Sequence, residues 1–447
     1  MRIIVAGMGA VGRHLATMLA NGKNEIIAID LHEDNLNSVQ DHADLVTIAG
    51  SVTSIGVLKR AEVEHADLFI AVANLESVNI TASILAKQMG AKRVIARIDN
   101  NDYLRSENSA LFKKLGIDTL IYPEKMASQV IINLLDENGT MEYVDFSQGR
   151  LSLAVFKVGE SMPLIGLSLM EIAQEATDIQ YRIVAITRYG ETIIPDGEER
   201  LHEGDTLHVI SDQKGIEQWR KWVGKETSEA ERIMVLGASR IGVRTCLDLE
   251  GELAEIKLIE GDPQKCHRID DLFKQTIVLN GDGRDTDFLI EEGIEGMDAF
   301  IAVTGSSETN ILTCMAARRA GVPYTIAEVE NLDYIQLAES LGIDTIVNKK
   351  LITASAIFRY TLGGNISSMY CMTGSDAQVL EFVAKDGARI TRGPIRGIKF
   401  PKQAVVGGVI RGDKAFIVEG SSEILAGDRV IVFTMEACAE KVGTFFA

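Results

Sequence analysis

The sequence predicts an α/β protein built from two doubly wound parallel-sheet domains, each followed by a small α+β domain. Two observations carry this prediction. A glycine-rich turn follows an apolar strand near the start of the chain, at Gly7, and again in the middle, at Gly237. Within each copy, short apolar runs rich in Val and Ile alternate with amphipathic stretches, which is the pattern of a parallel sheet covered by helices on both faces.

The chain carries an internal duplication, because its motifs recur in the same order at nearly constant spacing. ADLFIAVANLESVN, from Ala66, matches MDAFIAVTGSSETN, from Met297, and LGIDTLIYPEK near Gly116 matches LGIDTIVNKKL near Gly342. So small a drift in spacing indicates two copies of one domain. In the turn and strand that open each copy, the matched residues are Gly7, Gly12 and Asp30 with Gly237, Gly242 and Glu260.

The first copy contains six predicted strands with helices between them. Apolar runs of about four to eight residues suit buried strands, whereas longer amphipathic stretches suit helices. We expect strands at 2–7, 25–30, 45–50, 68–73, 93–98 and 119–123, and helices at 11–22, 32–42, 54–64 and 76–90. Successive right-handed strand–helix–strand units then give a doubly wound sheet.

After each of these units the pattern changes to short alternating strands, which indicates a small α+β domain. We expect strands at 152–158, 182–195 and 205–211 in the first copy, and at 378–384, 405–418 and 428–434 in the second. Two features recur in both copies: an Arg-then-Gly turn (Arg188–Gly190, Arg411–Gly412) and a Gly-Asp pair (Gly204-Asp205, Gly427-Asp428). The predicted domains are 1–136, 141–224, 231–360 and 366–447.

Composition argues against several classes of protein. The 447 residues include 45 Lys and Arg against 64 Asp and Glu, a net charge of −19, which disfavours binding to nucleic acid or to anionic lipid. No apolar run approaches the roughly 18 residues that span a bilayer. We therefore expect a cytoplasmic protein without direct membrane insertion. The odd number of cysteines and the absence of a CxxC pair predict free, buried thiols at Cys246, Cys266, Cys314, Cys371 and Cys438.

The first glycine-rich turn has the pattern of a nucleotide-binding site. In GxGxxG, Gly7 permits a tight turn, Gly9 lets the backbone approach a pyrophosphate, and Gly12 lets the helix pack closely on the strand. Asp30 ends the next strand, where a carboxylate accepts hydrogen bonds from ribose hydroxyls and repels a 2′-phosphate. We therefore predict a site for NAD or an adenine nucleotide rather than NADP, with an empty relic of such a cleft as the alternative. Its residues are Gly7, Met8, Gly9, Ala10, Val11, Gly12 and Asp30.

The second glycine-rich turn departs from this pattern, because Ser239 stands where the first copy has Gly9. Its Cβ and hydroxyl occupy the place where the backbone would approach a pyrophosphate. Arg240 offers a charge that pairs with phosphate, and Glu260 keeps the ribose-binding acid. Nucleotide binding and an empty cleft are equally open interpretations here. If a nucleotide binds, we expect weaker binding or a different ligand preference. The turn consists of Gly237, Ala238, Ser239, Arg240, Ile241 and Gly242.

Further candidate positions lie at the carboxyl ends of other strands, where open α/β sheets bind ligands. Ser51 follows the third strand, Ala73 and Asn74 follow the fourth, and Arg97 ends the fifth. Contact with ligand phosphates and a solvated salt bridge are both open for Arg97. Its counterpart Glu328 is unsuited to bind phosphate, so we expect the two clefts to differ electrostatically.

No set of residues predicts catalysis. A dehydrogenase needs a proton-transfer residue that faces the nicotinamide, and the first small domain offers only the histidines His202 and His208, whereas its duplicate contains no histidine. His208 falls in an alternating strand and is better explained as a packed or surface residue. The histidines of the chain lack metal-ligand spacing. We therefore expect neither catalytic residues nor a metal.

The domain layout, GMGAVG followed by IIAID, the segment FIAVANLESVN and the Gly-Asp turn together resemble the RCK family. RCK domains regulate potassium conductance, and a tandem arrangement in a stand-alone chain is similar to the peripheral subunits of Trk-type potassium uptake systems. The resemblance covers essentially the whole chain. It implies NAD or NADH, or alternatively ATP or ADP, as ligands. It also implies a homo-oligomeric ring, suspected to be a tetramer, beneath an integral membrane potassium channel subunit at the inner face of the plasma membrane.

The resemblance also assigns residues. The glycines of the first turn and Asp30 match the family's dinucleotide fingerprint, and Arg97 resembles its phosphate-contacting arginine. Many members have a Gly-Asp pair after the third strand, where this chain has Ser51 in the first copy and Asp282 in the second. The nucleotide preference of each cleft therefore stays open.

We expect a regulatory subunit that gates a potassium channel subunit by a ligand-dependent conformational change. Different nucleotides would order the turn at Gly7 and the region of Arg97 differently, and only their differential affinity for two conformations would shift the population. An NAD-dependent oxidoreductase with an unrecognised substrate is the competing class. A passive scaffold is the third.

Overall fold

The computed structural model describes residues 1–20, 24–40, 44–136, 140–146, 149–160, 162–175, 179–222, 230–358, 360–361, 366–372 and 377–447. The chain divides into two compact units. The first consists of Met1–Met126 with Lys349–Gly363, and the second of Ala127–Asn348 with Gly364–Ala447. Gly224, the predicted end of the first small domain, lies outside the described residues.

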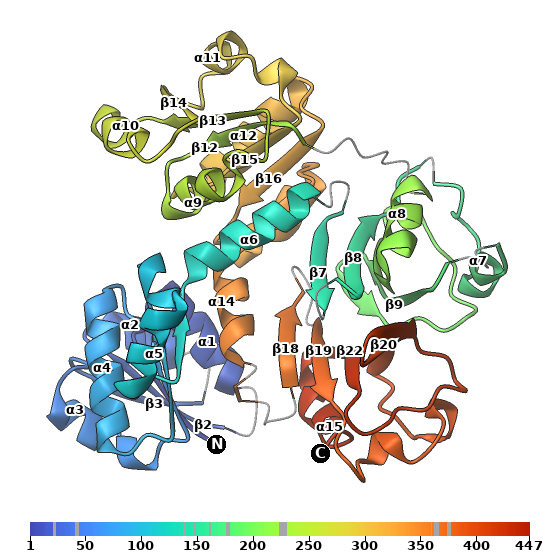
Figure 1. The fold of residues 1–447 in the computed structure, drawn as a ribbon, viewed down its shortest axis with the longest axis horizontal. Helices are drawn as coiled ribbons and strands as arrows, with labels where there is room; N and C mark the ends of the chain where they lie inside the picture. The colour runs from blue at the N-terminus through green and yellow to red at the C-terminus, as the bar shows by residue number, and fades with distance from the viewer. Residues whose placement is uncertain are drawn as a thin grey trace. The chain divides into compact units, whose positions relative to one another are not determined.

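The first unit contains a six-stranded parallel sheet, whose first strands are drawn in blue in Figure 1. Its strand order is β3-β2-β1-β4-β5-β6. This doubly wound Rossmann order reverses between β1 and β4, and ligands bind at such a reversal, outside the carboxyl ends of the strands. The central strand is apolar and buried, with Ile3, Ile4 and Val5 fully covered. The strands are β1 (Arg2–Ala6), β2 (Glu25–Asp30), β3 (Val46–Ala49), β4 (Leu68–Ala71), β5 (Arg93–Arg97) and β6 (Thr119–Ile121).

Amphipathic helices connect these strands and bury their apolar sides. Leu15 and Leu19 of α1, and Ala82 and Ala86 of α4, are fully buried. The helices between the strands are α1 (Ala10–Ala20), α2 (Glu33–Gln40), α3 (Ile55–Arg60), α4 (Glu76–Met89) and α5 (Ser106–Lys114).

Two further helices follow the sixth strands of the two copies. α14 (Lys349–Phe358) belongs to the first unit, where it packs against α1. α6 (Pro123–Asp136) begins in the first unit and continues into the second, where Thr245 donates a hydrogen bond to Ser128. The helix after each sixth strand therefore contributes to the unit that holds the other copy's sheet.

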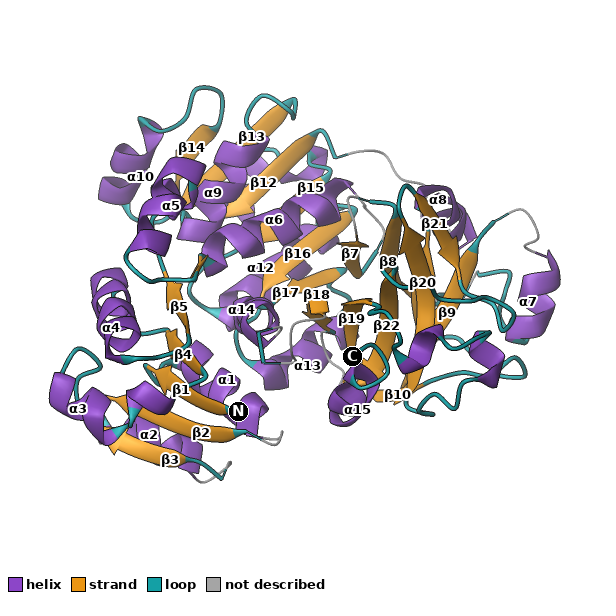
Figure 2. Cartoon of the chain, turned by 60° about the horizontal axis from the view of Figure 1, so that its bottom comes forward, coloured by secondary structure: helices purple, strands orange, loops and turns teal. Residues whose placement is uncertain are grey.

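The second unit contains a parallel sheet with the equivalent order, β14-β13-β12-β15-β16-β17 (Figure 2). The equal order confirms the duplication that the repeated motifs predict. The strands are β12 (Arg232–Leu236), β13 (Glu255–Glu260), β14 (Ile277–Asn280), β15 (Ala299–Ala302), β16 (Tyr324–Glu328) and β17 (Thr345–Val347). The helices are α9 (Arg240–Leu249), α10 (Pro263–Asp270), α11 (Thr286–Glu291), α12 (Ser307–Arg319) and α13 (Ile335–Ser340).

Each small domain is a five-stranded antiparallel sheet, in the equivalent orders β10-β9-β11-β8-β7 and β21-β20-β22-β19-β18. The first consists of β7 (Glu142–Phe146), β8 (Leu151–Lys157), β9 (Tyr181–Arg188), β10 (Glu191–Ile193) and β11 (Thr206–Ser211), with α7 (Leu169–Glu175) and α8 (Gln213–Trp222). The second consists of β18 (Ile366–Cys371), β19 (Ala377–Val383), β20 (Ala404–Arg411), β21 (Lys414–Ile417) and β22 (Arg429–Met435), with α15 (Ala439–Gly443).

A two-pronged ion pair explains the Arg and Gly-Asp motifs of both small domains. Arg188 donates to both carboxylate oxygens of Asp205 at 2.7 and 2.8 Å. Arg411 does the same to Asp428 at 2.9 and 2.7 Å. Both carboxylates are almost completely buried, so removing either arginine would leave an unpaired buried charge.

The two small domains share one apolar core within the second unit. Val184 and Ile210 of the first domain belong to the same buried cluster as Ile431 of the second. β20 can approach Ile210 of the first small domain closely only because residue 407 is glycine, since a Cβ there would collide with the Ile210 side chain. The two sheets therefore bury each other's apolar faces.

The predicted fold class is confirmed, and every predicted strand coincides with one or two observed strands. The predicted segment 182–195 is the hairpin of β9 and β10, whose turn places Tyr189 and Gly190 at φ 53° and 82°. The sequence analysis missed the edge strands β7 and β18 and several helices, including α5, α6 and α14. The domain limits remain predictions, and α14 lies within the predicted range 231–360.

One prediction about the cysteines needs correction. Cys246, Cys266, Cys314 and Cys438 are free and buried, whereas Cys371 is free but only half-buried. Cys371 ends β18, which lies at the edge of its sheet and, among the described strands, pairs with β19 alone. In the described residues, no helix is long and apolar enough to cross a membrane.

Candidate functional site

The first glycine-rich turn lies at the carboxyl end of β1 and leads into α1. Gly7 has φ +103°, and a Cβ there would come within 2.6 Å of the Ala73 nitrogen, so the position requires glycine. A Cβ at Gly12 would collide with the Gly7 carbonyl oxygen. At Gly9, by contrast, the nearest atom to an added Cβ is Asn74 Oδ1, at 3.4 Å. An added Cβ at position 9 would therefore make only an ordinary van der Waals contact, so the local geometry does not require glycine there as it does at positions 7 and 12.

Asp30, at the end of β2, ties the strand to this turn. Its Oδ2 accepts a hydrogen bond from the Met8 N–H at 2.6 Å, and its Oδ1 accepts from the His32 N–H at 2.8 Å and from Asn35 at 3.1 Å. Burial alone would raise the pKa of the Asp30 carboxyl, but these hydrogen bonds lower it below its usual value. Asp30 is thus a charged acceptor beside the turn, as a ribose-binding acid must be.

The other predicted residues of the turn are Met8, Ala10 and Val11. The side chains of Met8 and Val11 are buried in the core, and Ala10 begins α1. Ser51 and Asn74 lie just after β3 and β4, on the same edge of the sheet as Gly9. The Ser51 hydroxyl contacts the Thr53 hydroxyl at 2.9 Å. The structure therefore places the predicted residues of the first copy along one edge of the sheet.

The sequence analysis missed Asn79, a residue that joins the ends of β4 and β5. Its fully buried side chain accepts from the Ala73 N–H at 2.7 Å and donates to the carbonyls of Ala73 at 2.9 Å and Arg97 at 3.0 Å. Asn79 thus fixes the backbone that faces Gly7 across the cleft.

The second copy repeats this arrangement with Asn310. Its side chain accepts from the Thr304 N–H at 2.9 Å and donates to the carbonyls of Thr304 at 3.2 Å and Glu328 at 2.8 Å. The signal was present in the sequence, because the matched segments from Ala66 and Met297 both end in this asparagine. A buried asparagine can be recognised only once its backbone partners are known.

Arg97, at the end of β5, is ion-paired. Its Nη2 lies 3.0 Å from Glu124 Oε1 and 3.7 Å from Asp99 Oδ1. The side chains of Arg97 and Glu124 are 15% and 6% exposed, so the pair is largely buried rather than solvated. Of the two interpretations that the sequence leaves open, the structure shows the salt bridge. A phosphate would have to compete with Glu124 for the guanidinium.

In the second copy, Ser239 caps α9 with its own side chain. Its Oγ accepts a hydrogen bond from the Gly242 N–H at 3.2 Å. That N–H is one of the donors that an anion at the helix terminus would use. Arg240 begins α9 and is exposed, whereas Ala238 and Ile241 are buried. A phosphate here must displace the serine hydroxyl.

Glu260, the counterpart of Asp30, is ion-paired with Lys265 of α10. Its Oε2 lies 2.6 Å from Lys265 Nζ and accepts from the Ala238 N–H at 3.2 Å, and its Oε1 accepts from the Asp262 N–H at 3.1 Å. Burial alone would raise the pKa of the Glu260 carboxyl, but Lys265 and the two N–H groups lower it. The acid of the second cleft is therefore charge-compensated within the protein.

Asp282, just after β14, forms a second ion pair at this edge. Arg284 Nε and Nη2 donate to its two carboxylate oxygens at 2.9 and 2.8 Å, and Arg284 lowers the pKa of the Asp282 carboxyl to about 2. Gly237, Ser239, Glu260 and Asp282 line one cavity of about 670 Å³. That size lies within the range of about 300–1,000 Å³ typical of small-molecule sites. Four of the predicted residues of the second copy thus meet at one cavity, whereas the other four do not line it: Ala238, Arg240, Ile241 and Gly242.

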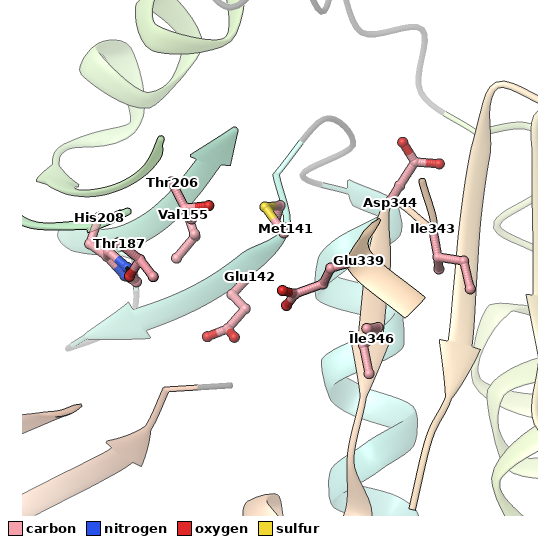
Figure 3. Close-up of a pocket in the computed structure, with 10 residues that line it drawn as sticks. All are labelled: Met141, Glu142, Val155, Thr187, Thr206, His208, Glu339, Ile343, Asp344 and Ile346. Atoms are coloured by element: carbon pink, nitrogen blue, oxygen red, sulfur yellow. Dashed lines mark hydrogen bonds between the residues drawn. The ribbon is translucent and has the colours of Figure 1, made fainter. Parts of the chain in front are cut away.

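A separate small cavity lies beside β11, lined by His208, Glu142 and Glu339 among others (Figure 3). His208 is 3% exposed, contacts Thr187 Oγ1 at 3.0 Å, and lies near the Phe433 ring. Burial lowers its pKa to about 4, so the ring is neutral near pH 7. The cavity holds about 40 Å³, room for water rather than a nucleotide. The prediction that His208 is a packed residue is confirmed.

Among the described residues, no group of three or more His, Cys, Asp and Glu side chains is arranged to hold a metal ion. The polar groups of the two clefts are backbone N–H groups, carboxylates and basic side chains. These groups bind phosphates and sugar hydroxyls.

Two Rossmann sheets with a glycine-rich turn and a strand-end acid, each followed by a small antiparallel domain, define a tandem α/β chain with two candidate nucleotide clefts. The TrkA-N domain model matches residues 3–123 and 233–349, and the TrkA-C domain model matches residues 153–224. The chain therefore belongs to the TrkA family, and the resemblance seen in the sequence is confirmed. The second small domain has the strand order of the first but lies outside the matched TrkA-C range.

Full-length relatives support this assignment. The chain is 30% identical over 455 residues to Trk system potassium uptake protein TrkA homolog 1 of Methanosarcina mazei, with 100% of both chains covered. It is 29% identical over 439 residues to Trk system potassium uptake protein TrkA of Vibrio alginolyticus, covering 97% of this chain and 95% of the relative.

Solved structures share the fold at low sequence identity. The GsuK RCK domain aligns with a TM-score of 0.61 at 18% identity, covering 99% of this chain and 94% of that one. A GsuK channel bound to NAD aligns with a TM-score of 0.60 at 18% identity, covering 99% of this chain and 78% of that one.

Proposed function

We propose that this chain is the regulatory subunit of a Trk-type potassium uptake system, which binds a nucleotide and thereby gates an integral membrane potassium channel subunit. The observation that carries the proposal is the duplicated Rossmann cleft, with Gly7 and Gly237 at φ +103° and +102° and an acid at the end of each second strand. Its full-length relatives are named as Trk potassium uptake proteins.

NAD or NADH is the proposed ligand of the first cleft, with ATP or ADP as the alternative. The absence of a side chain at Gly9 would let a pyrophosphate approach the backbone at the amino end of α1, and Asp30 is a charged acceptor for ribose hydroxyls. The fold neighbours include GsuK structures described as bound to NAD and to ADP. Arg97 and Asn74 would face the rest of the ligand.

We expect the second cleft to bind nucleotide more weakly. Its helix terminus already receives the Ser239 hydroxyl, and its acid already pairs with Lys265. A ligand must replace both internal contacts, whereas Gly9 has no side chain that could occupy the helix terminus. The residues we propose to contact a ligand there are Gly237, Ala238, Ser239, Arg240, Ile241, Gly242, Glu260 and Asp282.

The proposed switch acts through Arg97 and Glu124. Glu124 lies in the first turn of α6, the helix that runs from the first unit into the second. A ligand phosphate that draws Arg97 away from Glu124 would free the start of this helix. Nucleotides that differ in this contact would favour different conformations, and a differential affinity of about 1–3 kcal/mol would shift the population about 5–150-fold.

A homo-oligomeric ring, suspected to be a tetramer, is the proposed assembly. Exposed leucines recur at matched places in the two copies: Leu111 and Leu115 at α5 are 54% and 38% exposed, and Leu337 and Leu341 at α13 are 52% and 39% exposed. Repeated apolar patches on equivalent helices suit contacts between copies of the chain. Attachment through the channel subunit would place the ring on the cytoplasmic face of the plasma membrane, without direct membrane insertion or nucleic-acid binding.

A regulatory role is favoured over an NAD-dependent oxidoreductase. His208, a candidate proton-transfer residue, is buried beside a cavity too small for a nucleotide. Steady conversion of NADH by the purified chain with any substrate would support the enzyme instead. Potassium uptake that does not respond to nucleotide would support a passive scaffold.

Calorimetric titration of the purified chain with NAD, NADH, ATP and ADP tests the proposal. We expect binding to the first cleft that Asp30→Ala weakens at least about tenfold, since a charged hydrogen-bond acceptor is lost. Asp44→Ala, which removes an exposed acid of the same domain, is the matched control. In cells, Asp30→Ala should alter potassium uptake and Asp44→Ala should not. Failure of all four nucleotides to bind would refute the proposal.

A further inference from the structure

The two clefts differ in charge beside the ribose-binding acid. Asn35 and Lys265 occupy equivalent positions, five residues after Asp30 and Glu260. Thr53 in the first copy is likewise equivalent to Arg284 in the second. The second copy therefore has two basic side chains where the first has neutral ones, and both line its cavity.

In the first cleft, the acid is satisfied by uncharged groups. In the described part of the chain, the groups that donate to Asp30 are the Met8 and His32 N–H groups and the Asn35 amide. Arg13 approaches this network, but its Nη1 donates to the Met8 carbonyl and to Asn35 Oδ1. A second anion placed beside Asp30 would thus face a carboxylate without a direct cationic partner.

In the second cleft, each acid has a cation of its own. Lys265 contacts Glu260 at 2.6 Å, and Arg284 holds Asp282 through both carboxylate oxygens. The Lys265 and Arg284 side chains are 35% and 71% exposed, so both can turn toward a ligand in the cavity. An incoming anion would either replace the carboxylate as the partner of each cation or share the cation with it.

We propose that the second cleft prefers adenine nucleotides that carry a phosphate on the ribose 2′ position, such as NADP, whereas the first cleft prefers an unphosphorylated ribose. The inference rests on the proposed function, because it assumes that both clefts bind nucleotides through the strand-end acid. An acid at this position favours a free 2′-hydroxyl, and an adjacent basic side chain accommodates a 2′-phosphate. Lys265 and Arg284 are placed for that second role.

The test isolates each cleft in the full-length chain. Gly9→Asp blocks the first cleft by placing a carboxylate at the pyrophosphate position, and its Cβ would make only an ordinary contact with the Asn74 side chain. Ser239→Asp blocks the second cleft in the same way. Calorimetry with NAD and NADP then gives their affinity ratio for the open cleft of each variant. Adenosine 2′,5′-bisphosphate against ADP, which has the same number of phosphate groups, shows whether the position of the phosphate matters.

With the first cleft blocked, we expect NADP to bind about tenfold more tightly than NAD, the gain from one or two charge-assisted contacts. Adding Lys265→Asn and Arg284→Thr, the residues of the first copy, should abolish this preference. Lys274→Asn and Arg319→Thr remove the same charges from exposed positions outside the cavity and should leave it intact. With the second cleft blocked, NAD should bind more tightly than NADP.

Equal ratios of NADP affinity to NAD affinity in the two clefts would overturn the inference. Equal affinities of the second cleft for ADP and for adenosine 2′,5′-bisphosphate would overturn it as well. A second cleft that binds none of these ligands would also overturn it, while binding of NAD to the first cleft would leave the proposed function standing. If no nucleotide binds either cleft and circular dichroism shows folded variants, both proposals fail.

Discussion

Replacing Ser239 by glycine should open the second cleft. The Ser239 Oγ accepts from the Gly242 N–H at 3.2 Å, so a ligand phosphate must first displace a neutral hydrogen bond. Such a bond contributes about 1 kcal/mol, and its removal should tighten nucleotide binding about fivefold. Glycine is itself an acceptable helix cap, so α9 should lose only a few tenths of a kcal/mol.

The reciprocal change provides the control. Gly9→Ser introduces the same side chain at the equivalent position of the first cleft, where an added Cβ would make only an ordinary contact with Asn74, and should weaken binding there by a similar factor. Isothermal calorimetry with ADP measures each effect in a chain whose other cleft is blocked by Asp. Unchanged or weaker binding after Ser239→Gly, with the chain still folded, would show that the serine cap does not restrict the cleft.

Three further predictions concern stability and assembly. Asn79→Ala removes three buried hydrogen bonds and should destabilise the first unit by about 3 kcal/mol or more in urea unfolding. Asn310→Ala should destabilise the second unit in the same way. A loss of unfolding free energy below about 1 kcal/mol would contradict the role of these asparagines in joining the strand ends. The pKa of His208 is lowered from 6.5 to about 4, so the unfolded chain takes up the proton first and stability is lost as pH falls between these values. His208→Gln should remove roughly 3 kcal/mol of that pH dependence. Identical pH profiles of stability for the variant and the original chain would contradict the assigned burial of this ring. Leu111→Asp with Leu115→Asp should shift the chain toward smaller species in analytical ultracentrifugation without unfolding it, and an unchanged mass would show that α5 lies outside the interface.

The sequence was sufficient to predict the sheets and the geometry of the first glycine-rich turn. Apolar β-branched runs have few alternatives to buried strands, and Gly7 and Gly12 are required by local geometry that a motif records directly. The sequence could not predict the ion-pair partner of each charged residue. Arg97 was equally suited to a phosphate and to a salt bridge, because Glu124 is distant in sequence and becomes adjacent only when β5 and α6 are in place.

The missed elements share a physical reason. β7 and β18 are edge strands, with little apolar alternation to mark them, and are held by pairing with one neighbour. α14 follows its own copy in the sequence but packs against α1 of the other copy. Such an exchange follows from tertiary packing, which periodicity does not reveal. Lys265 was missed similarly, since its significance depends on lying 2.6 Å from Glu260.

The common interior of the two antiparallel domains has a consequence for how the molecule is built. Because Ile210 and Ile431 belong to one buried cluster, either domain alone would expose apolar surface that the other domain covers in this chain. Because both domains belong to one chain, their pairing is intramolecular, and its strength does not depend on protein concentration.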